Sequence, residues 1–425
     1  MDLLNGSILS VVLIIVYWLL WRCRNKRMLM LAAQLPGPTA LPILGNALMF
    51  MTKPEEQLKK IATLLEKYGD YIRFWLGPDL VIVIKDPNDI RCLLTSNKMN
   101  QKGPAYDYMT PFIGKGILTG GTLMGLSKED IAKLKHLDEV IHETQNMYSL
   151  IFTKMTRWWL QIPFIYWLSG NYRKQLYYQR IVDALITDII QKRRKSIGKE
   201  ENYGMGVVDR FILNGLSENE IKLESFALFT TSQEASAKIA SGVLLFLAHL
   251  PEWQSKVYEE IVHVIDDDSV SEDQIRRLEN LDMVYKEVLR YLSIAALIQR
   301  TVEEDVTINN GKFTLPSGTV VAIPIHEVHR DSRFWDEPLK IKPERFLPEN
   351  QKNRNPNAFI PFSLGAMDCL GRVYATTLIK TIVIRVLRHV EVTAEGKLED
   401  LDLHVAISVK FAEGYNLRVR PRINK

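Results

Sequence analysis

The sequence predicts a mainly helical protein with small β-sheets. Apolar residues recur at helical spacing over long stretches, as in residues 55–68, where Leu58, Ile61 and Leu65 share one face. Shorter alternating stretches around glycine-containing turns are fewer. Of the 425 residues, 47% are hydrophobic and 24% are charged, so the chain can bury a large core. We therefore expect one large helical body.

The helices and strands are expected in the following order. After the helix over residues 55–68, helices are expected over residues 127–155, 176–194 and 223–250. The last of these is apolar on several faces, which is typical of a helix through the middle of a core. Hairpins are expected over residues 71–85 and 306–323, and the tail over 390–419 is rich in strand-forming residues.

The N-terminal segment differs from the rest of the chain. Residues 8–21 are almost wholly apolar and are followed by Arg22, Arg24 and two more cationic residues. Because positive charge stays on the cytosolic side, residues 1–35 are expected to be a retained membrane anchor with its flank. The prolines within residues 36–42 predict a stiff hinge, and residues 36–425 form the body, which is expected in the cytosol.

Charge and cysteine content exclude some classes of function. The net charge of +4 is too small to indicate nucleic-acid binding. Three scattered cysteines cannot form a disulfide framework, which fits a protein facing the cytosol. His326 and His329 lack the spacing of the zinc-protease motif, so no metal site is expected there.

The most informative segment surrounds one cysteine. Residues 362–371 read Phe-Ser-Leu-Gly-Ala-Met-Asp-Cys-Leu-Gly and precede a stretch that is expected to be helical. Glycines such as Gly365 and Gly371 let the backbone approach a flat ligand. A helix N-terminus favours the thiolate of Cys369, which is then a candidate metal ligand. The alternative is a small buried hydrophobe, the usual role of a lone cysteine.

Two further motifs accompany this segment. Glu287 and Arg290 share one face of an expected helix, and Arg345 follows in a Pro-Glu-Arg-Phe sequence. On its own the Glu–Arg pair could be a solvated ion pair contributing less than about 1 kcal/mol. Together, however, the motifs resemble those of cytochrome P-450, the haem-thiolate monooxygenases. The family pattern is Phe-x-x-Gly-x-Arg-x-Cys-x-Gly, and only Met367 departs from it, in place of the Arg.

The resemblance implies a cytochrome P-450 fold that binds haem b. Cys369 would be the axial ligand of the haem iron, within the haem-binding segment that also contains Phe362, Gly365 and Gly371. Electron donation by the thiolate favours cleavage of the O–O bond of bound oxygen. Glu287, Arg290 and Arg345 would form a buried triad that locks the segment leading to the cysteine.

The resemblance also implies three positions at which members of the family have cationic partners for the haem propionates. Arg300 suits the first position, and Met367 stands at the second. The third, in a Trp-x-x-x-Arg helix, is missing from this chain. The chain is roughly seventy residues shorter than a usual microsomal member, so we expect that an internal block is absent near residues 126/127.

Proton delivery in the family uses an acid followed by Thr in the long helix. The acid is retained as Glu234, but Ala235 stands at the position of the usual Thr. Ser236, Ser232 or Thr231 could substitute through a water molecule. Glu234 could equally be a carboxylate on the surface of the helix.

The flanking sequences are most similar to the animal family-4 group, particularly its insect members. This implies a monooxygenase at the endoplasmic reticulum membrane that oxidises a fatty acid, hormone, odorant or xenobiotic with O2. Electrons would come from NADPH–cytochrome P-450 reductase, with cytochrome b5 as a possible further partner. Apolar residues in 105–117 and 158–168 are expected to line the pocket of this lipophilic substrate.

Two alternatives remain open. Ala235 favours a haem-thiolate isomerase or dehydratase that needs no oxygen activation. Met367 and the absent block favour a truncated product that binds haem weakly and is impaired or not an enzyme.

Overall fold

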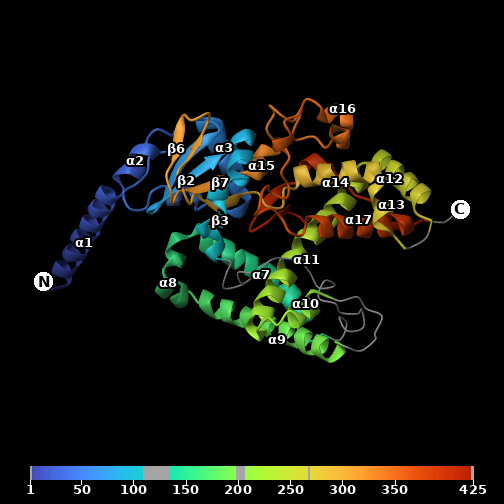
Figure 1. The fold of residues 1–425 in the computed structure, drawn as a ribbon, viewed down its shortest axis with the longest axis horizontal. Helices are drawn as coiled ribbons and strands as arrows, with labels where there is room; N and C mark the ends of the chain where they lie inside the picture. Colours follow the sequence, from blue (N-terminus) through green and yellow to red (C-terminus); the bar gives the residue numbers. More distant parts are fainter. Residues whose placement is uncertain (1, 109–133, 198–205, 267–268, 423–425) are drawn as a thin grey trace.

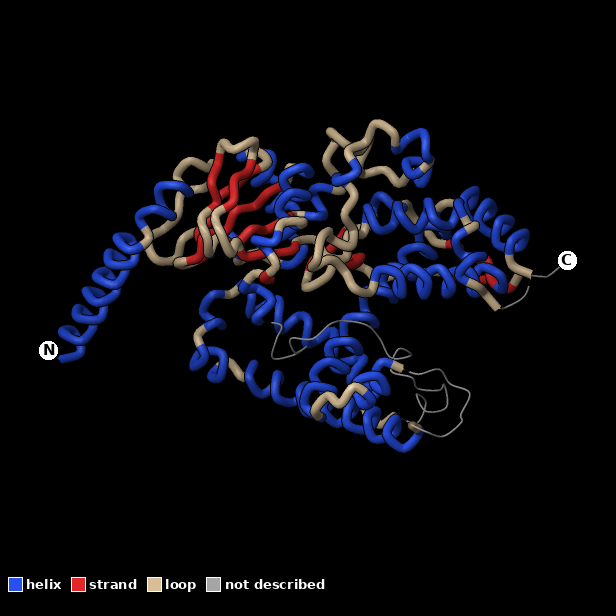
Figure 2. Tube along the Cα trace, in the orientation of Figure 1, coloured by secondary structure: helices blue, strands red, loops and turns tan. Residues whose placement is uncertain are grey.

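The computed structural model describes residues 2–108, 134–197, 206–266 and 269–422. Helices form most of the described chain, and the largest sheet lies at the end of the molecule that is nearer to the N-terminus (Figure 2). This arrangement confirms the prediction of a mainly helical fold with small sheets.

The described α-helices follow the chain in order, with short helices at several turns. They are α1 (Asp2–Arg24), α2 (Lys26–Ala32), α3 (Pro54–Tyr68), α4 (Pro87–Leu94), α7 (Leu137–Thr156), α8 (Pro163–Leu168), α9 (Asn171–Ser196), α10 (Val207–Leu213), α11 (Glu218–His249), α12 (Pro251–Val264), α13 (Glu272–Arg276), α14 (Glu279–Tyr291), α15 (Ile325–Val328), α16 (Pro348–Gln351) and α17 (Arg372–His389).

The described strands form one five-stranded sheet and three two-stranded sheets. They are β1 (Tyr71–Leu76), β2 (Asp79–Ile84), β3 (Gln101–Lys102), β4 (Ile298–Thr301), β5 (Val306–Ile308), β6 (Phe313–Leu315), β7 (Val320–Ile323), β8 (Val390–Thr393), β9 (Leu403–Val405), β10 (Val409–Phe411) and β11 (Arg418–Pro421). The large sheet has the order β1-β2-β7-β4-β3, and the others pair β5 with β6, β8 with β11, and β9 with β10.

The first predicted hairpin is confirmed, and the second is corrected. Strands β1 and β2 pair antiparallel with Tyr71 opposite Ile84. Residues 313–323 were expected to form one arm of a hairpin, but they contain two strands. The chain turns at Gly318, whose φ of +85° favours glycine, so only β6 pairs with β5. Strand β7 instead joins the large sheet between β2 and β4.

Helix α11 crosses the middle of the body, as expected for residues 223–250 (Figure 1). It begins at a capping box in which Ser217 and Glu220 satisfy each other's backbone N–H groups. It ends before Pro251, which starts α12. Val243 and Phe246 belong to the largest hydrophobic core together with residues of α12, α14 and α17. The helix therefore connects the parts of the body that surround the cysteine segment.

The flanking helices are shifted from their predicted ranges. The helix expected over residues 127–155 begins at Leu137 in the described structure, after His136 in the left-handed region. Residues 127–133 lie outside the described residues. Helix α9 extends the prediction for residues 176–194 at both ends. Helices α7 and α9 lie side by side and share a hydrophobic core with Phe229 of α11.

The N-terminal anchor is not confirmed by the described residues. Helix α1 projects from the body (Figure 1) and exposes large apolar side chains such as Leu13, Tyr17 and Leu20. Within the described parts of the chain, however, no helix has both the length and the apolarity needed to cross a membrane.

The predicted hinge over residues 36–42 is attached to the sheet. The N–H of Arg73 in β1 donates to the carbonyl of Pro36 at 2.8 Å. A Cβ atom at Gly37 would lie 2.2 Å from the carbonyl oxygen of Arg73, so glycine is required for this close approach. The body therefore holds the segment that follows α2 in place.

Candidate functional site

The cysteine loop is a tight turn that leads into α17. The N–H of Cys369 donates to the carbonyl of Phe362 at 2.9 Å, which closes the loop. Helix α17 then begins at Arg372, and the backbone of Gly371 donates a hydrogen bond to the Cys369 sulfur. Phe362 packs against the largest core, whereas Cys369 is exposed. The loop therefore presents a thiol at the start of a helix.

Gly365 makes a close backbone contact within the protein. Its φ is +78°, and a Cβ atom there would lie 1.9 Å from the carbonyl oxygen of Leu94 in α4. No side chain fits this contact, so Gly365 sets how closely the loop packs against the backbone of α4. The expectation that this glycine also lets a flat ligand approach stays a prediction.

The electrostatics of the thiol also differ from the expectation. Although Cys369 is exposed as a residue, the protein atoms around its sulfur partly desolvate it and raise its pKa, while the hydrogen bond from the Gly371 backbone acts to lower the pKa. The start of α17 was expected to favour the thiolate, but desolvation outweighs that effect. A bound metal ion deprotonates a coordinating thiol, so the thiolate is the form expected with iron.

Arg300 reaches the cysteine loop from β4. Its side chain is buried, and Nη2 donates to the carbonyl of Met367 at 2.9 Å and lies 3.5 Å from Oγ of Ser363. Nη1 donates to the carbonyl of Gln299. Met367, at the position of the family's Arg, is itself partly exposed. The structure therefore places the predicted propionate partner against the loop that contains Cys369.

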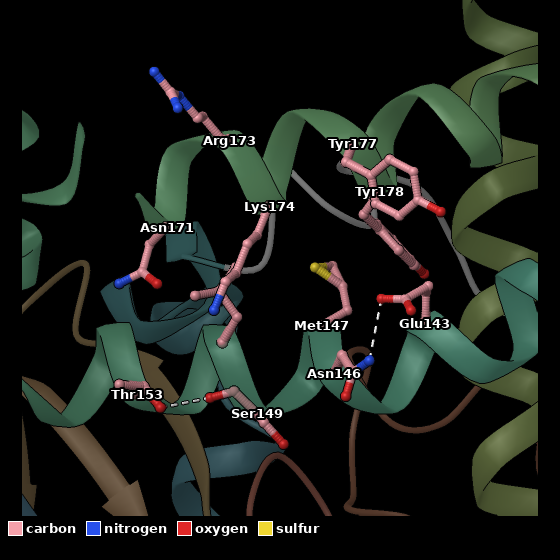
Figure 3. Close-up of a pocket in the computed structure, with 11 residues that line it drawn as sticks. Glu143, Asn146, Met147, Ser149, Thr153, Asn171, Arg173, Lys174, Tyr177 and Tyr178 are labelled. Atoms are coloured by element: carbon pink, nitrogen blue, oxygen red, sulfur yellow. Dashed lines mark hydrogen bonds between the residues drawn. The ribbon is translucent and has the colours of Figure 1, made fainter. Parts of the chain in front are cut away.

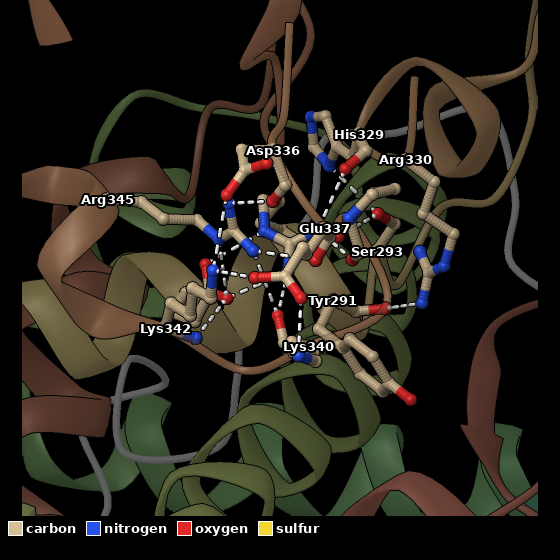
Figure 4. Close-up of polar contacts among 12 residues, drawn as sticks. Tyr291, Ser293, His329, Arg330, Asp336, Glu337, Lys340, Lys342 and Arg345 are labelled. Carbon is tan, nitrogen blue, oxygen red and sulfur yellow. Dashed lines mark hydrogen bonds and ion pairs between the residues drawn. The ribbon is translucent and has the colours of Figure 1, made fainter. Parts of the chain in front are cut away.

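Glu287 and Arg290 form a fully buried ion pair on α14. Figure 4 shows the polar contacts of this region, with Arg345, Lys340 and Lys342 among the labelled residues. Arg290 donates to both carboxylate oxygens, at 2.8 and 2.7 Å. Its remaining N–H groups reach the carbonyls of His329, Pro338 and Lys340. An interior pair of this kind is tolerated because further hydrogen bonds satisfy both groups, so the solvated alternative does not apply.

Arg345 is the third residue of the predicted triad, and it reaches the ion pair of Glu287 and Arg290. Its Nε lies 3.4 Å from Oε1 of Glu287, and its Nη2 donates to the carbonyls of Glu337 and Lys340. Glu287 also accepts the backbone N–H of Lys342 at 2.9 Å. The three predicted triad residues therefore meet, and they hold residues 336–342 against α14.

His329 is a residue that the sequence analysis considered only as a metal ligand. Its Nε2 accepts the backbone N–H of Ile360 at 2.9 Å, and its Nδ1 lies 2.9 Å from Oγ of Ser293. Because Ser293 donates to the carbonyl of Arg290, the neutral ring donates from Nδ1. His329 thus connects α14 to the backbone just before the cysteine loop. Its spacing in the sequence carries no signal for this role.

The three predicted residues of α11 have different surroundings. Glu234 forms an ion pair with Lys238 one turn later and accepts a hydrogen bond from Ser408 at 3.2 Å. Burial lowers the pKa of Lys238, and Glu234 opposes this shift. Glu234 is therefore a half-buried carboxylate that connects α11 to the turn between β9 and β10, and not a freely solvated group.

The hydroxyl groups near Ala235 are unequal substitutes for the missing Thr. Thr231 donates to the carbonyl of Ala227, and Ser232 donates to that of Phe229, so both bond to their own helix. Ser236 is buried, and its hydroxyl has no partner among the described residues. Of the three candidates, Ser236 retains a donor that a water molecule could use.

The described cavity is separate from this site. A trough of about 740 Å³ lies between α7 and α9, and its lining combines polar side chains such as Glu143 and Asn146 with apolar ones such as Met147 (Figure 3). Residues 109–117 of the expected lining lie outside the described residues. Among the described residues of the other stretch, Phe164, Trp167 and Leu168 are exposed on the surface instead of lining this trough.

Comparison with known proteins identifies the family. A model described as "Cytochrome P450" matches residues 35–122 and 129–410. This chain belongs to the cytochrome P450 family. It is therefore a monooxygenase of the haem-thiolate class, with haem b as its cofactor. The two matched segments are separated by residues 123–128 of this chain.

Similar curated proteins belong to P450 family 4. Cytochrome P450 4c3 of Drosophila melanogaster is 24% identical over 96% of this chain and 93% of its own length. Cytochrome P450 4V2 of Homo sapiens is 24% identical over 91% of this chain and 90% of its own. The alignment with cytochrome P450 4d1 of Drosophila melanogaster, 25% identical, covers both chains fully and extends over 514 positions. This chain has 425 residues, so the alignment contains positions that it does not fill.

The described residues fit this cofactor. A soft sulfur ligand is exposed at Cys369, and the cation of Arg300 reaches the same loop through Met367. None of the side chains that contact Arg300 in the described residues is a carboxylate. This donor set suits a ligand that combines an iron centre with peripheral acidic groups.

Proposed function

We propose that this protein oxidises a lipophilic small molecule, using O2 and electrons that NADPH–cytochrome P450 reductase supplies. The cysteine loop is the observation that carries the proposal. It combines an exposed thiol, a backbone N–H on its sulfur, and a buried cation within reach of the loop. Cytochrome b5 would be a second electron donor.

Each residue of the loop has a defined part in this proposal. Cys369 would be the axial ligand, Gly371 would hold its sulfur by a backbone N–H, and Arg300 would bind a propionate. When bound, haem b activates O2, and its thiolate ligand favours O–O cleavage. The triad of Glu287, Arg290 and Arg345, together with His329, would keep the loop in position without contacting the reacting atoms.

On α11, protons would be delivered by a changed route. Glu234 is the carboxylate that would relay protons, and Ala235 offers no hydrogen bond beside it. The proposed path uses a water molecule on the Ser236 hydroxyl. Because Lys238 and Ser408 engage the Glu234 carboxylate, this group must leave the ion pair and take up a proton from solvent before it can pass one on.

We further propose that the protein works at the endoplasmic reticulum membrane, with its body in the cytosol. Two separate apolar surfaces support this, namely α1 and the exposed aromatic residues of α8. Phe164 and Trp167 stack at 6.2 Å on α8. Helices α1 and α8 both lie toward the left of Figure 1. A substrate that partitions into lipid would be available there.

A second candidate function is isomerisation or dehydration of an oxygenated substrate without oxygen activation. Ala235 is the observation that favours it, because this position lacks the hydroxyl that supports proton delivery. Consumption of NADPH with reductase and a lipophilic substrate distinguishes the two functions. Turnover that requires neither NADPH nor reductase would favour the isomerase or dehydratase.

A third candidate is a truncated product with weak haem binding. The break in the family match at residues 123–128 and the unfilled alignment positions support the absence of an internal block. Met367 removes a further propionate partner. Haem content after reconstitution tests this candidate, because a stoichiometric and stable complex would exclude it.

The decisive experiment is a carbon-monoxide difference spectrum of the reduced full chain after reconstitution with haem b. We expect the Soret shift that is characteristic of thiolate ligation, and we expect Cys369→Ala to abolish it. Cys92→Ala, an exposed cysteine on α4, is the matched control and should leave the spectrum unchanged. A spectrum that survives Cys369→Ala would contradict the ligand assignment.

A further inference from the structure

The turn between β9 and β10 forms a polar contact with the middle of α11. The Ser408 hydroxyl accepts a hydrogen bond from Nζ of Lys238 at 2.5 Å and donates to Oε1 of Glu234 at 3.2 Å. The side chains of Lys238 and Glu234 are only 12% and 21% exposed. One cation and one hydroxyl group therefore compensate the largely buried carboxylate of Glu234.

The chain that follows β10 places Tyr415 in the core that α11 shares. The chain turns at Gly414, whose φ is +84° and whose N–H donates to the carbonyl of Phe411 at 3.3 Å. The ring of Tyr415 then packs edge-on against that of Phe411, with the ring centroids 5.5 Å apart, and contacts the largest hydrophobic core. Ring packing therefore fixes this side chain, and its hydroxyl takes no part in that packing.

The hydroxyl group of Tyr415 is buried without a partner. It is shielded from solvent and forms no hydrogen bond within the described residues. Such groups are rare, because a buried hydroxyl loses its contacts with water and needs a replacement. Burial raises the pKa of Tyr415, and the nearby charge of Glu234 raises it further. Tyr415 is therefore a protonated donor close to a carboxylate to which it is not bonded in this structure.

Other buried tyrosines of the body have a partner for the same group. The hydroxyl of Tyr166 donates to Oε1 of Gln175 at 3.0 Å. That of Tyr285 lies 3.0 Å from Oγ1 of Thr376. The missing partner at Tyr415 is thus a feature of its position and not of buried tyrosines in this protein.

We propose that Tyr415 is a positioning residue that receives the Glu234 carboxyl group when this group leaves Lys238 and Ser408. The inference rests on the proposed proton route, in which Glu234 must leave its ion pair, and it adds the place to which the carboxyl group moves. A phenol hydroxyl can donate to a carboxylate and can accept from a carboxylic acid, so it holds both protonation states. Tyr415 itself keeps its proton.

The first measurement is a double-mutant cycle on the unfolding equilibrium of the full chain, which requires no turnover. In the wild type, Tyr415→Phe should leave the unfolding equilibrium constant unchanged or lower it, because it removes a hydroxyl without a partner. Lys238→Met frees Glu234 from its cation. In that background, Tyr415→Phe should raise the unfolding constant roughly ten-fold to a hundred-fold, the effect of losing one hydrogen bond to a charged group.

Two controls identify the acceptor. When Glu234→Ala is added to Lys238→Met, Tyr415→Phe should again have no unfavourable effect, because the carboxylate is gone. Tyr166→Phe removes a hydroxyl that is already bonded, to Gln175. It should therefore destabilise the wild type and Lys238→Met to the same extent.

The second measurement is the hydrogen peroxide released per NADPH consumed in a reductase-coupled assay. Tyr415→Phe should raise this ratio by up to about ten-fold, because the carboxyl group that leaves Lys238 is no longer held for proton delivery. Tyr172→Phe, which changes an exposed tyrosine on α9, should leave the ratio unchanged.

Three results would overturn the inference alone. The first is an equal effect of Tyr415→Phe in the wild type and in Lys238→Met, as expected if the hydroxyl only holds a buried water molecule. The second is an unfavourable effect that persists after Glu234→Ala, which would assign the hydroxyl to another acceptor. The third is an unchanged peroxide ratio in Tyr415→Phe while the wild type turns over. Failure of the wild type to show the thiolate Soret signature would instead overturn the proposed function, and the role of Tyr415 in proton delivery with it.

Discussion

The region around Glu287 on α14 and the region around Glu234 on α11 differ in how completely their polar groups are bonded. Around Glu287 and Arg290, one buried ion pair is joined to several backbone carbonyls and to a second guanidinium. On α11, Glu234 has an ion pair with Lys238 and one serine contact, and Ala235 contributes no polar group. The region around Glu287 is therefore densely bonded, whereas the part of α11 around Ala235 has few polar contacts.

This difference indicates that the geometry around the cysteine loop is preserved more completely than the polar groups of α11. A loop that must hold a thiolate depends on geometry, and the buried network supplies that geometry. Proton delivery can be rerouted through water, so a missing hydroxyl there changes efficiency more than structure. Four variants test whether the two regions respond as differently as their bonding suggests.

Breaking the buried pair should have the largest effect. Arg290→Leu leaves the Glu287 carboxylate buried without its partner and removes the donors to three carbonyls. We expect a loss of about 3–5 kcal/mol in the free energy of unfolding, measured by denaturant titration. Arg276→Leu removes an exposed partner of Glu272 and should change stability little. Equal effects of the two substitutions would show that the network does not support the loop.

The next largest effect is expected at Gly365. An alanine there must move away from the carbonyl of Leu94 and also adopt a positive φ. We expect a loss on the order of 3 kcal/mol in unfolding free energy, together with weaker haem retention. Gly396→Ala is the matched control, because it has a φ of +79° with nothing within 4 Å of the added Cβ. It should cost only about 1–2 kcal/mol, the penalty of the left-handed backbone. If the two losses are the same, the contact with α4 has no energetic role.

A smaller effect is expected from acid. Burial lowers the pKa of His329 well below its ordinary value, and the charges of Arg290 and Arg330 lower it further. The unfolded chain therefore binds more protons than the folded one below about pH 6.5, so stability should fall as the pH decreases from about 7 to 5. His329→Gln should make this decrease shallower, as measured by denaturant midpoints at several pH values. His142→Gln, on the exposed side of α7, should leave the pH dependence as it is in the wild type.

The smallest effect is expected at Ala235. Ala235→Thr restores a hydroxyl next to Glu234, so less hydrogen peroxide should be released per NADPH consumed in a reductase-coupled assay. We expect a change within about ten-fold and little change in stability. Ala237→Thr places the same side chain on an exposed position of α11 and should not alter the ratio. An unchanged ratio in Ala235→Thr would indicate that Ser236 already performs this role.

The sequence by itself determined the fold class, the cysteine loop and the triad. These depend on local patterns, namely helical periodicity, glycine spacing around Cys369, and an i,i+3 Glu–Arg pair on one helix. Periodicity does not report which strand a segment joins, so residues 313–323 were misassigned to a single hairpin arm. The close approach of Gly365 to α4 involves residues far apart in the sequence, which no local pattern contains.

Only the tertiary structure decided the electrostatic environment of the site. It showed that burial raises the pKa of Cys369 despite the helix start, that Glu234 is paired with Lys238, and that His329 bonds to the backbone of Ile360. It also brought Lys102 opposite Arg300 through the pairing of β3 with β4. Desolvation and charge–charge contacts depend on distances in space, and residues separated by nearly two hundred positions acquire those distances only when the chain folds.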